Sequence, residues 1–133
     1  MDEQQRRVHA ASAQLRELLN EQCPRCGAAF LDFNGCCALT CHRCGCGFCA
    51  WCLADCGADA HAHVAHCDRN LEPGRSVFSS DRLVEEGRRA RRHEAAVALL
   101  TALPREVAAE VAVAVAAELA DVGLTEVVHL FRL

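Results

Sequence analysis

Apolar residues near the start of the chain follow the period of an α-helix. Within residues 3–21 the apolar positions lie three or four apart among Gln, Arg and Glu: Val8, Ala11, Leu15 and Leu18. This spacing puts the four side chains on one face of a helix. We therefore predict an amphipathic helix in residues 1–22 that packs on the rest of the chain. A short coiled-coil contact with a partner is the alternative, although two heptads are too few to indicate one by pattern alone.

The C-terminal part, residues 81–133, also has the helical period. Ser80 is suited to cap a first helix that runs to about residue 103. Pro104 fits the first turn of a second helix, and Gly123 fits its end. The second helix has an aliphatic residue at every fourth position: Val107, Val111, Val115 and Leu119. With a last short helix from Thr125, these elements predict a helical hairpin tail. We expect it to bury its apolar ridge against itself or against the N-terminal helix.

The middle of the chain, residues 23–67, lacks such a pattern and has few large apolar side chains. All eleven cysteines of the protein lie in this segment. The apolar surface that this segment can bury is too small to fold it. We therefore expect metal to supply much of its folding free energy, about 10–16 kcal/mol per structural zinc site. The predicted elements are loops, small hairpins and a final helical turn. Residues 68–80, with Asn70, Pro73 and Gly74, predict a linker.

The spacing of the cysteines is typical of zinc sites. A Cys-x2-Cys pair lets one backbone turn direct two thiolates at one ion. We assign four cysteines to a first site and one pair to a second: Cys23, Cys26, Cys41 and Cys44 for the first, Cys49 and Cys52 for the second. The predicted cofactor is two Zn²⁺ ions.

The second site needs two further ligands from the end of the segment. We predict Cys67 as one of them. His63 lies four residues before Cys67, so a helical turn would put both on one face. His61 is the alternative to His63, and Cys56 is a third candidate.

The cysteine content could also indicate a secreted disulfide scaffold, but several features favour metal. The cysteine count is odd, and the opening Met1-Asp2-Glu3 has no apolar core of a signal peptide. Close Cys-x2-Cys pairs are typical of metal sites in a reducing compartment. No apolar run approaches the ~20 residues of a membrane span. We therefore expect an intracellular protein, cytoplasmic or nuclear, that does not bind a membrane.

The charge pattern bears on the expected partners. The formal net charge is −4, and all basic residues are Arg. Zinc held by thiolates adds negative charge, which argues against non-specific nucleic-acid binding. One predicted helix carries a basic cluster: Arg88, Arg89, Arg91, Arg92 and His93. Such a cluster is typical of a solvated helix face, with a nuclear-import or acidic-partner patch as the alternative.

Several motifs of residues 23–67 follow one another in a known order: Cys23-Pro24-Arg25-Cys26, Asn34-Gly35-Cys36, Cys41, Cys44, Phe48-Cys49-Ala50-Trp51-Cys52 and the His/Cys tail. This order resembles the catalytic second RING, and the related in-between-RING domain, of RING-between-RING ubiquitin ligases. The resemblance implies a small two-zinc RING-like domain with helical flanks. It also implies that Cys36 accepts ubiquitin as a thioester from a conjugating enzyme.

Four cysteines are not needed for the two sites: Cys36, Cys37, Cys46 and Cys56. Cys36 follows Gly35 and is either a buried filler or a nucleophile. Where the family usually has a histidine, two residues after the nucleophile, this chain has Ala38. We therefore predict a zinc-binding protein-interaction module. Its expected partner is a ubiquitin-charged conjugating enzyme or another ligase subunit. The alternative is a ubiquitin transferase with Cys36 as acceptor.

Overall fold

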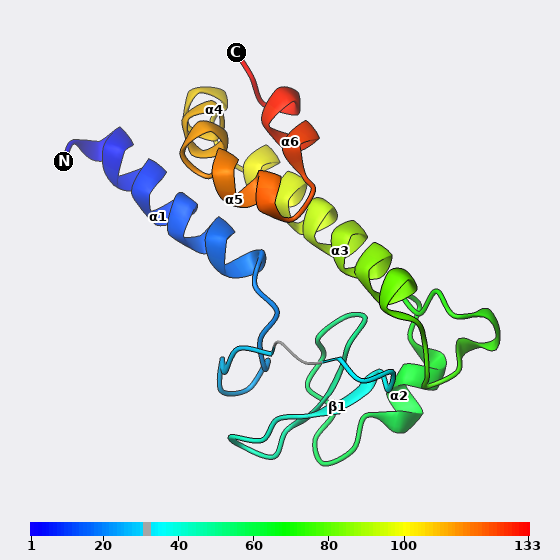
Figure 1. Cartoon of the computed structure of the whole chain (residues 1–133). Coiled ribbons are helices and arrows are strands. Elements are labelled where there is room, and N and C mark those ends of the chain that lie inside the picture. Colours follow the sequence, from blue (N-terminus) through cyan, green and yellow to red (C-terminus); the bar gives the residue numbers. More distant parts are fainter. Residues whose placement is uncertain (31–32) are drawn as a thin grey trace. The chain divides into compact units, whose positions relative to one another are not determined.

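The computed structural model describes residues 1–30 and 33–133, which form two compact units (Figure 1). The helical unit contains Met1–Asn20 and Arg92–Leu133, and the cysteine unit contains Glu21–Arg91. The predicted segments 1–22, 23–67, 68–80 and 81–133 stay predictions, and residues 31 and 32 of the second lie outside the described residues.

The helical unit begins with α1 (Glu3–Leu18), which ends four residues before the predicted boundary at residue 22. Asp2 caps this helix, because its side chain accepts from the Gln5 amide while the Gln5 side chain accepts from the Asp2 amide. The other helices are the second half of α3 (Asp81–Thr101), α4 (Arg105–Ala114), α5 (Ala116–Asp121) and α6 (Thr125–Leu130).

The predicted C-terminal ridge forms the core of the helical unit. Its four residues, Val107, Val111, Val115 and Leu119, are buried together with Leu15 of α1. The N-terminal helix therefore packs on the C-terminal helices, as predicted, and α1 packs mainly against α4. The single helix predicted after Pro104 is interrupted at Val115, whose backbone (φ −106°, ψ 10°) separates α4 from α5. The ridge remains continuous across this break.

The cysteine unit is built around a short hairpin. Strand β1 (Ala38–Thr40) pairs antiparallel with β2 (Gly47–Cys49), and Leu39 lies opposite Phe48. The turn of the hairpin carries Cys41 and Cys44, and β2 ends at Cys49. Helix α2 (His61–His66) is the predicted helical turn, and a 3₁₀ turn, η1 (Pro73–Arg75), follows it.

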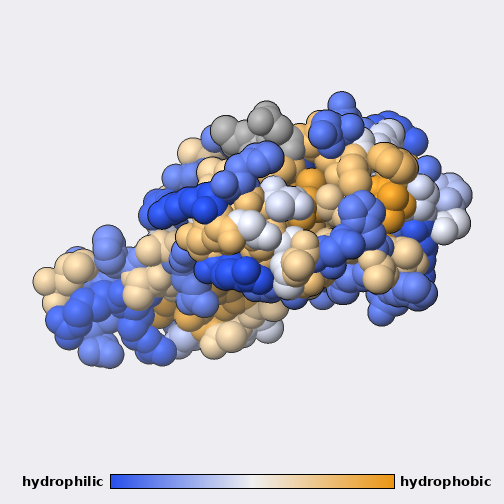
Figure 2. All heavy atoms as spheres, turned by 90° about the horizontal axis from the view of Figure 1, so that it is seen from below, coloured by the Kyte–Doolittle hydropathy of each residue, from blue (hydrophilic) through white to orange (hydrophobic). Residues whose placement is uncertain are grey.

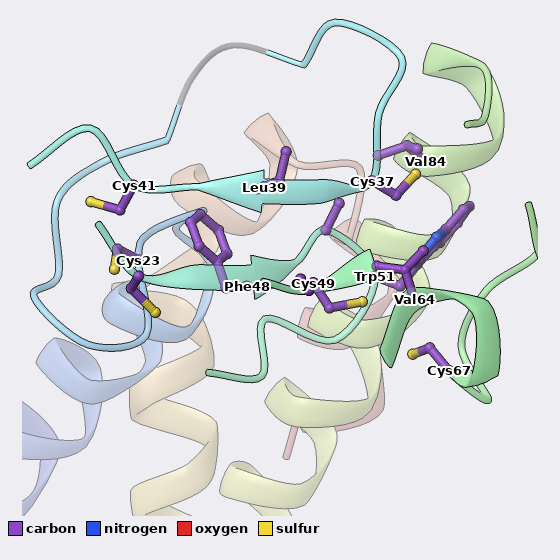
Figure 3. Close-up of a cluster of buried hydrophobic side chains, with 13 residues drawn as sticks. Cys23, Cys37, Leu39, Cys41, Phe48, Cys49, Trp51, Val64, Cys67 and Val84 are labelled. Carbon is purple, nitrogen blue, oxygen red and sulfur yellow. The ribbon is translucent and has the colours of Figure 1, made fainter. Parts of the chain in front are cut away.

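A small apolar core supports the hairpin (Figure 3). Phe48, Trp51, Val64 and Val84 are each at most 1% exposed. Val84 lies in the first turns of α3, which belong to the cysteine unit. Gly87 of α3 permits this packing, because a Cβ there would lie 2.6 Å from Trp51 Cε3.

The predicted linker has a defined structure in the cysteine unit. Its backbone pairs with the segment that carries Cys36: Cys37 N donates to Val77 O at 2.7 Å, and Ser79 N donates to Gly35 O at 2.9 Å. Ser80 then caps α3, because its Oγ accepts from Leu83 N at 3.1 Å. Residues 77–79 thus act as an extra strand beside residues 35–37.

The prediction of a solvated basic face is wrong for three arginines of the cluster. The side chains of Arg88 and Arg91 are only 16% and 12% exposed and pair with the Glu21 carboxylate, which is 8% exposed. Arg92 is 7% exposed. The pairs with Glu21 hold the beginning of the cysteine unit to α3, which sequence pattern alone did not indicate.

None of the helices in the described residues is long and apolar enough to cross a membrane. On the face of the molecule shown in Figure 2, hydrophilic residues are interspersed with hydrophobic ones.

Candidate metal centre

The first predicted ligand set comes together in the structure. The sulfur atoms of four cysteines lie within 4.8 Å of one another: Cys23, Cys26, Cys41 and Cys44. Cys23 and Cys44 are 3.6 Å apart, and Cys26 and Cys41 are 3.7 Å apart, measured between Sγ atoms. A tetrahedron of sulfurs around zinc, with Zn–S bonds of about 2.3 Å, has edges of about 3.8 Å. The group therefore has the size of a zinc site.

Two backbone turns of the same kind build this group. Gly27 N donates to Cys23 O at 2.9 Å, and Gly45 N donates to Cys41 O at 2.8 Å. Both glycines have φ of +78°, a conformation that side chains disfavour. The residue after each Cys-x2-Cys pair thus closes the turn that points both sulfurs to the same side.

Backbone amides favour the thiolate form within the first group. Burial raises the pKa of Cys23, but hydrogen bonds with the amides of Cys26 and Arg25 and with two neighbouring thiols outweigh burial, and the pKa falls to about 6. The amide of Cys44 lowers the pKa of Cys41 against the opposing effect of burial, and the Arg43 amide adds to this effect. Because the ligating form of cysteine is the thiolate, these amides prepare the group for a cation.

The second group contains Cys49, Cys52, His63 and Cys67, with all donor atoms within 4.8 Å of one another. Cys52 Sγ lies 3.2 Å from His63 Nε2. Hydrogen bonding with Cys49 is the main cause that lowers the pKa of Cys52, to about 4. The group offers three sulfurs and one imidazole nitrogen, a common ligand set for structural zinc.

The second group uses the same turn with a different residue. Leu53 N donates to Cys49 O at 2.8 Å, as the glycines do in the first group. Leu53 has φ of +61°, which costs a non-glycine residue about 1 kcal/mol. The surrounding contacts therefore hold this turn in a conformation that the local sequence disfavours.

Helix α2 brings the last two ligands together. His63 lies in the helix, and Cys67 is the residue that ends it. The structure places His63, and neither His61 nor Cys56, in the second group. The ring of His61 instead contacts the Asp59 carboxylate, and Cys56 Sγ donates to Ala54 O at 3.4 Å.

The two groups follow each other along the chain. Figure 3 shows Cys23 and Cys41 at one end of the hairpin and Cys49 and Cys67 toward the other. Arg25, inside the first Cys-x2-Cys pair, donates to Asp55 with Nε and Nη2 at 3.1 and 3.0 Å. The guanidinium holds the pKa of the Asp55 carboxyl well below its usual range. This ion pair connects the loop of one group to the loop that follows Cys52.

The donor atoms fit zinc. Each group supplies four thiol or imidazole donors within 4.8 Å of one another, and neither group includes a carboxylate as calcium or magnesium would require. Four protein ligands fill the coordination sphere of zinc, so each group has the composition of a structural site.

Cys36 lies apart from both groups, at the edge of a hollow of about 310 Å³. The hollow is lined by Ala29, Phe30, Asn34, Cys36, Ala38, Leu39, Thr40 and His42. The thiol of Cys36 is half-buried and donates to Ala38 O at 3.5 Å. Cys37 and Cys46 are fully buried, and burial raises the pKa of each to about 11. Among these three cysteines, only Cys36 opens to the hollow.

Sequence reasoning missed the surroundings of Cys36. It predicted residues 68–80 as a linker, whereas residues 77–79 pair with the Cys36 segment. It also left His42 unplaced, and the structure puts His42 in the lining of the same hollow. Asn70 was an available signal in the sequence, because Asn side chains in loops often hydrogen-bond to nearby backbone groups.

Comparison with known proteins gives one local similarity. Over 46 residues, 35% of this chain, the sequence is 44% identical to Cullin-9 of Mus musculus. The matched stretch spans 2% of the length of Cullin-9. No family model matches the chain, and no solved structure matches it significantly. The two ligand groups fit a zinc-binding module.

Proposed function

We propose that the chain is a zinc-binding protein-interaction module that works within a ubiquitin-ligase assembly. The observation that carries the proposal is the pair of complete ligand groups in one compact unit. Cys23, Cys26, Cys41 and Cys44 bind one Zn²⁺ ion, and Cys49, Cys52, His63 and Cys67 bind the other. The ligase context rests on the local similarity to Cullin-9 and on the order of motifs in residues 23–67.

Zinc has a structural part in this proposal. The ions hold three Cys-x2-Cys turns and the end of α2 around a core of few large side chains. The folded unit then presents its surface to a protein partner. The proposed partner is a ubiquitin-charged conjugating enzyme or another subunit of the ligase.

Metal content gives the first test. Native mass spectrometry of the whole chain should show two Zn²⁺ ions per molecule. His63→Ala should reduce this number to one, because it removes a ligand of the second group. His61→Ala is the matched control and should retain two ions. Two ions in His63→Ala, or only one ion in His61→Ala, would contradict the assignment of ligands.

Partner binding gives the second test. The zinc-loaded chain should bind a ubiquitin-charged conjugating enzyme when measured by surface plasmon resonance, and His63→Ala should weaken this binding. If the wild-type chain binds neither a charged nor an uncharged conjugating enzyme, the conjugating enzyme is excluded as partner. A ligase subunit would then be the partner to test.

A second candidate function is ubiquitin transfer through Cys36. The observation that favours it is the position of the Cys36 thiol at a hollow that also contains an imidazole and an amide side chain. The Cys36 thiolate would attack the thioester carbonyl carbon of the charged enzyme. A new S–C bond forms, the old one breaks, and the thiolate of the conjugating enzyme leaves. Ubiquitin is then joined to Cys36 as a thioester.

The chain is well suited to a direct test of this step. A charged conjugating enzyme should give an adduct that thiols cleave, and Cys36→Ser should give a thiol-resistant ester in its place. Cys37→Ala is the control and should still form the adduct. Because the chain has no lysine, an isopeptide on a lysine side chain cannot form the background. An adduct that survives Cys36→Ala would exclude Cys36 as the acceptor.

A further inference from the structure

The segment after the last ligand is anchored by one buried side chain. Asn70 is 8% exposed, and its Nδ2 donates to Val64 O at 2.9 Å and to Ser76 O at 3.2 Å. Its Oδ1 accepts from Glu72 N at 2.9 Å. Asn70 N also donates to Cys67 O at 3.0 Å. The amide thus ties the end of α2 to the chain that leads away from it.

The anchored chain then runs beside Cys36. Cys36 and Phe78 are directly opposite in an antiparallel bridge. The two backbone hydrogen bonds join the flanking residues, Cys37 N to Val77 O and Ser79 N to Gly35 O. In such a non-hydrogen-bonded pair the two Cα atoms are about 4.5 Å apart and the side chains lie on the same face. The Phe78 side chain, which is 63% exposed, therefore flanks the Cys36 side chain.

This pairing fixes the backbone of a residue that no metal group holds. Cys36 is five residues before the nearest downstream ligand, Cys41, and outside both groups. The side chain of Ser79 adds a further restraint, because its Oγ donates to Glu72 Oε2 at 2.7 Å. The position of the thiol at the hollow thus depends on residues 70–79, which we name the strap.

We propose that the strap is a positioning element for Cys36, which holds the thiol at the hollow for reaction with an acyl donor. The proposal rests on the second candidate function as far as the acyl donor is concerned. The placement of the thiol itself does not depend on that function. Residues of the strap act through Cys36 and do not take part in bond making. Phe78 closes one side of the thiol, and the hollow is the remaining route of approach.

Ser79 offers a matched pair of variants. Ser79→Pro removes the amide that donates to Gly35 O as well as the hydroxyl. Ser79→Ala removes only the hydroxyl and keeps the amide. Alkylation of zinc-loaded protein by iodoacetamide, followed by peptide mass spectrometry, measures the reactivity of Cys36. We expect Cys36 to react about fivefold faster in Ser79→Pro than in Ser79→Ala, because the freed segment opens locally. Cys37 should stay unreactive in both.

A second variant covers the case that Ser79→Pro loses zinc or does not fold. Phe78→Gly weakens the strap by raising the flexibility of an exposed position, without removing a buried group. Phe78→Ala is its control, since it removes the same ring but keeps a Cβ, so that only the backbone flexibility differs. Cys36 should react faster with iodoacetamide in Phe78→Gly than in Phe78→Ala. Equal rates at Cys36 in both members of each folded pair would overturn the proposal.

The transfer reaction separates positioning from simple exposure. In Ser79→Pro we expect the rate constant of adduct formation to fall at least about tenfold while the rate of alkylation of Cys36 rises. The reason is that the thiol is accessible but misplaced. A parallel rise of both rates would overturn the positioning role. If the wild-type chain forms no adduct, the second candidate function fails, and the alkylation pairs alone still decide whether the strap places Cys36.

Discussion

The two units of this protein reach a folded state by different means. The helical unit buries a continuous set of aliphatic residues, among them Leu15, Val111 and Leu119, each fully buried. In the cysteine unit the corresponding core has four large side chains near zero exposure, and cysteines make up much of the rest. Hydrophobic burial suffices where the chain repeats aliphatic residues at helical spacing. Where it does not, as in the cysteine unit, the two ligand groups offer sites for metal ions, whose binding contributes folding free energy.

Removal of metal is expected to have the largest effect, and only on one unit. A chelator should unfold the cysteine unit, since each structural zinc supplies about 10–16 kcal/mol. The helical unit should keep its structure because its core contains no ligand. Hydrogen exchange measured by mass spectrometry should lose protection in residues 36–67 and retain it in residues 5–18 and 105–120. Retained protection in residues 36–67 without metal would contradict the contrast between the units.

A cavity in the helical core should give the reverse result. Leu15→Ala removes a fully buried side chain and should lower the free energy of unfolding of the helical unit by about 2–5 kcal/mol. Leu18→Ala in the same helix is the control, because Leu18 is 39% exposed and should cost much less. Thermal unfolding monitored by circular dichroism measures both. The zinc content of Leu15→Ala should stay at two ions per chain, whereas loss of zinc would show that the units are not independent.

A substitution at Gly87, where α3 contacts Trp51, tests the small apolar core of the cysteine unit. In an unconstrained helix Gly87→Ala would be stabilising by about 1 kcal/mol. Here the new Cβ would lie 2.6 Å from Trp51 Cε3, so we expect a net loss of about 1–3 kcal/mol. Chemical denaturation of the zinc-loaded protein measures the change. Trp51→Phe should restore part of the loss in the double variant, and simple additivity of the two changes would exclude the clash as the cause.

The same contrast explains how far the sequence predicted the structure. Helical periodicity identified the core of the helical unit down to Val107 and Leu119, because one face of a helix is a local property of the chain. Ligand spacing indicated the first metal group completely, since Cys-x2-Cys turns are local as well. The choice between His61 and His63 stayed open because both fit a turn near Cys67. Only the fold, which places the ring of His61 against Asp59, brings His63 to the cysteines.

Features that depend on contacts between distant residues could not be predicted in this way. The pairing of Cys36 with Phe78 joins positions 42 residues apart. It is made by backbone hydrogen bonds of the antiparallel type, which almost any sequence can form. Likewise, the basic cluster has the composition of a solvated face, but Arg88 and Arg91 both pair with the distant Glu21 and are largely buried. In both cases the partner that decides the outcome lies far away in the sequence, at position 78 or 21.

The smallest expected effect compares the turns of the two metal groups. Gly45→Ala introduces a side chain at φ of +78° with no neighbouring atom in the way, so only backbone strain of about 1 kcal/mol should result. Leu53 already adopts a similar conformation in the second group, which shows that such a turn can close with a residue other than glycine. Gly45→Ala should therefore still bind two zinc ions and should release the ion of the first group to a competing chelator several-fold faster. An unchanged release rate would mean that the glycine is not needed to close the turn.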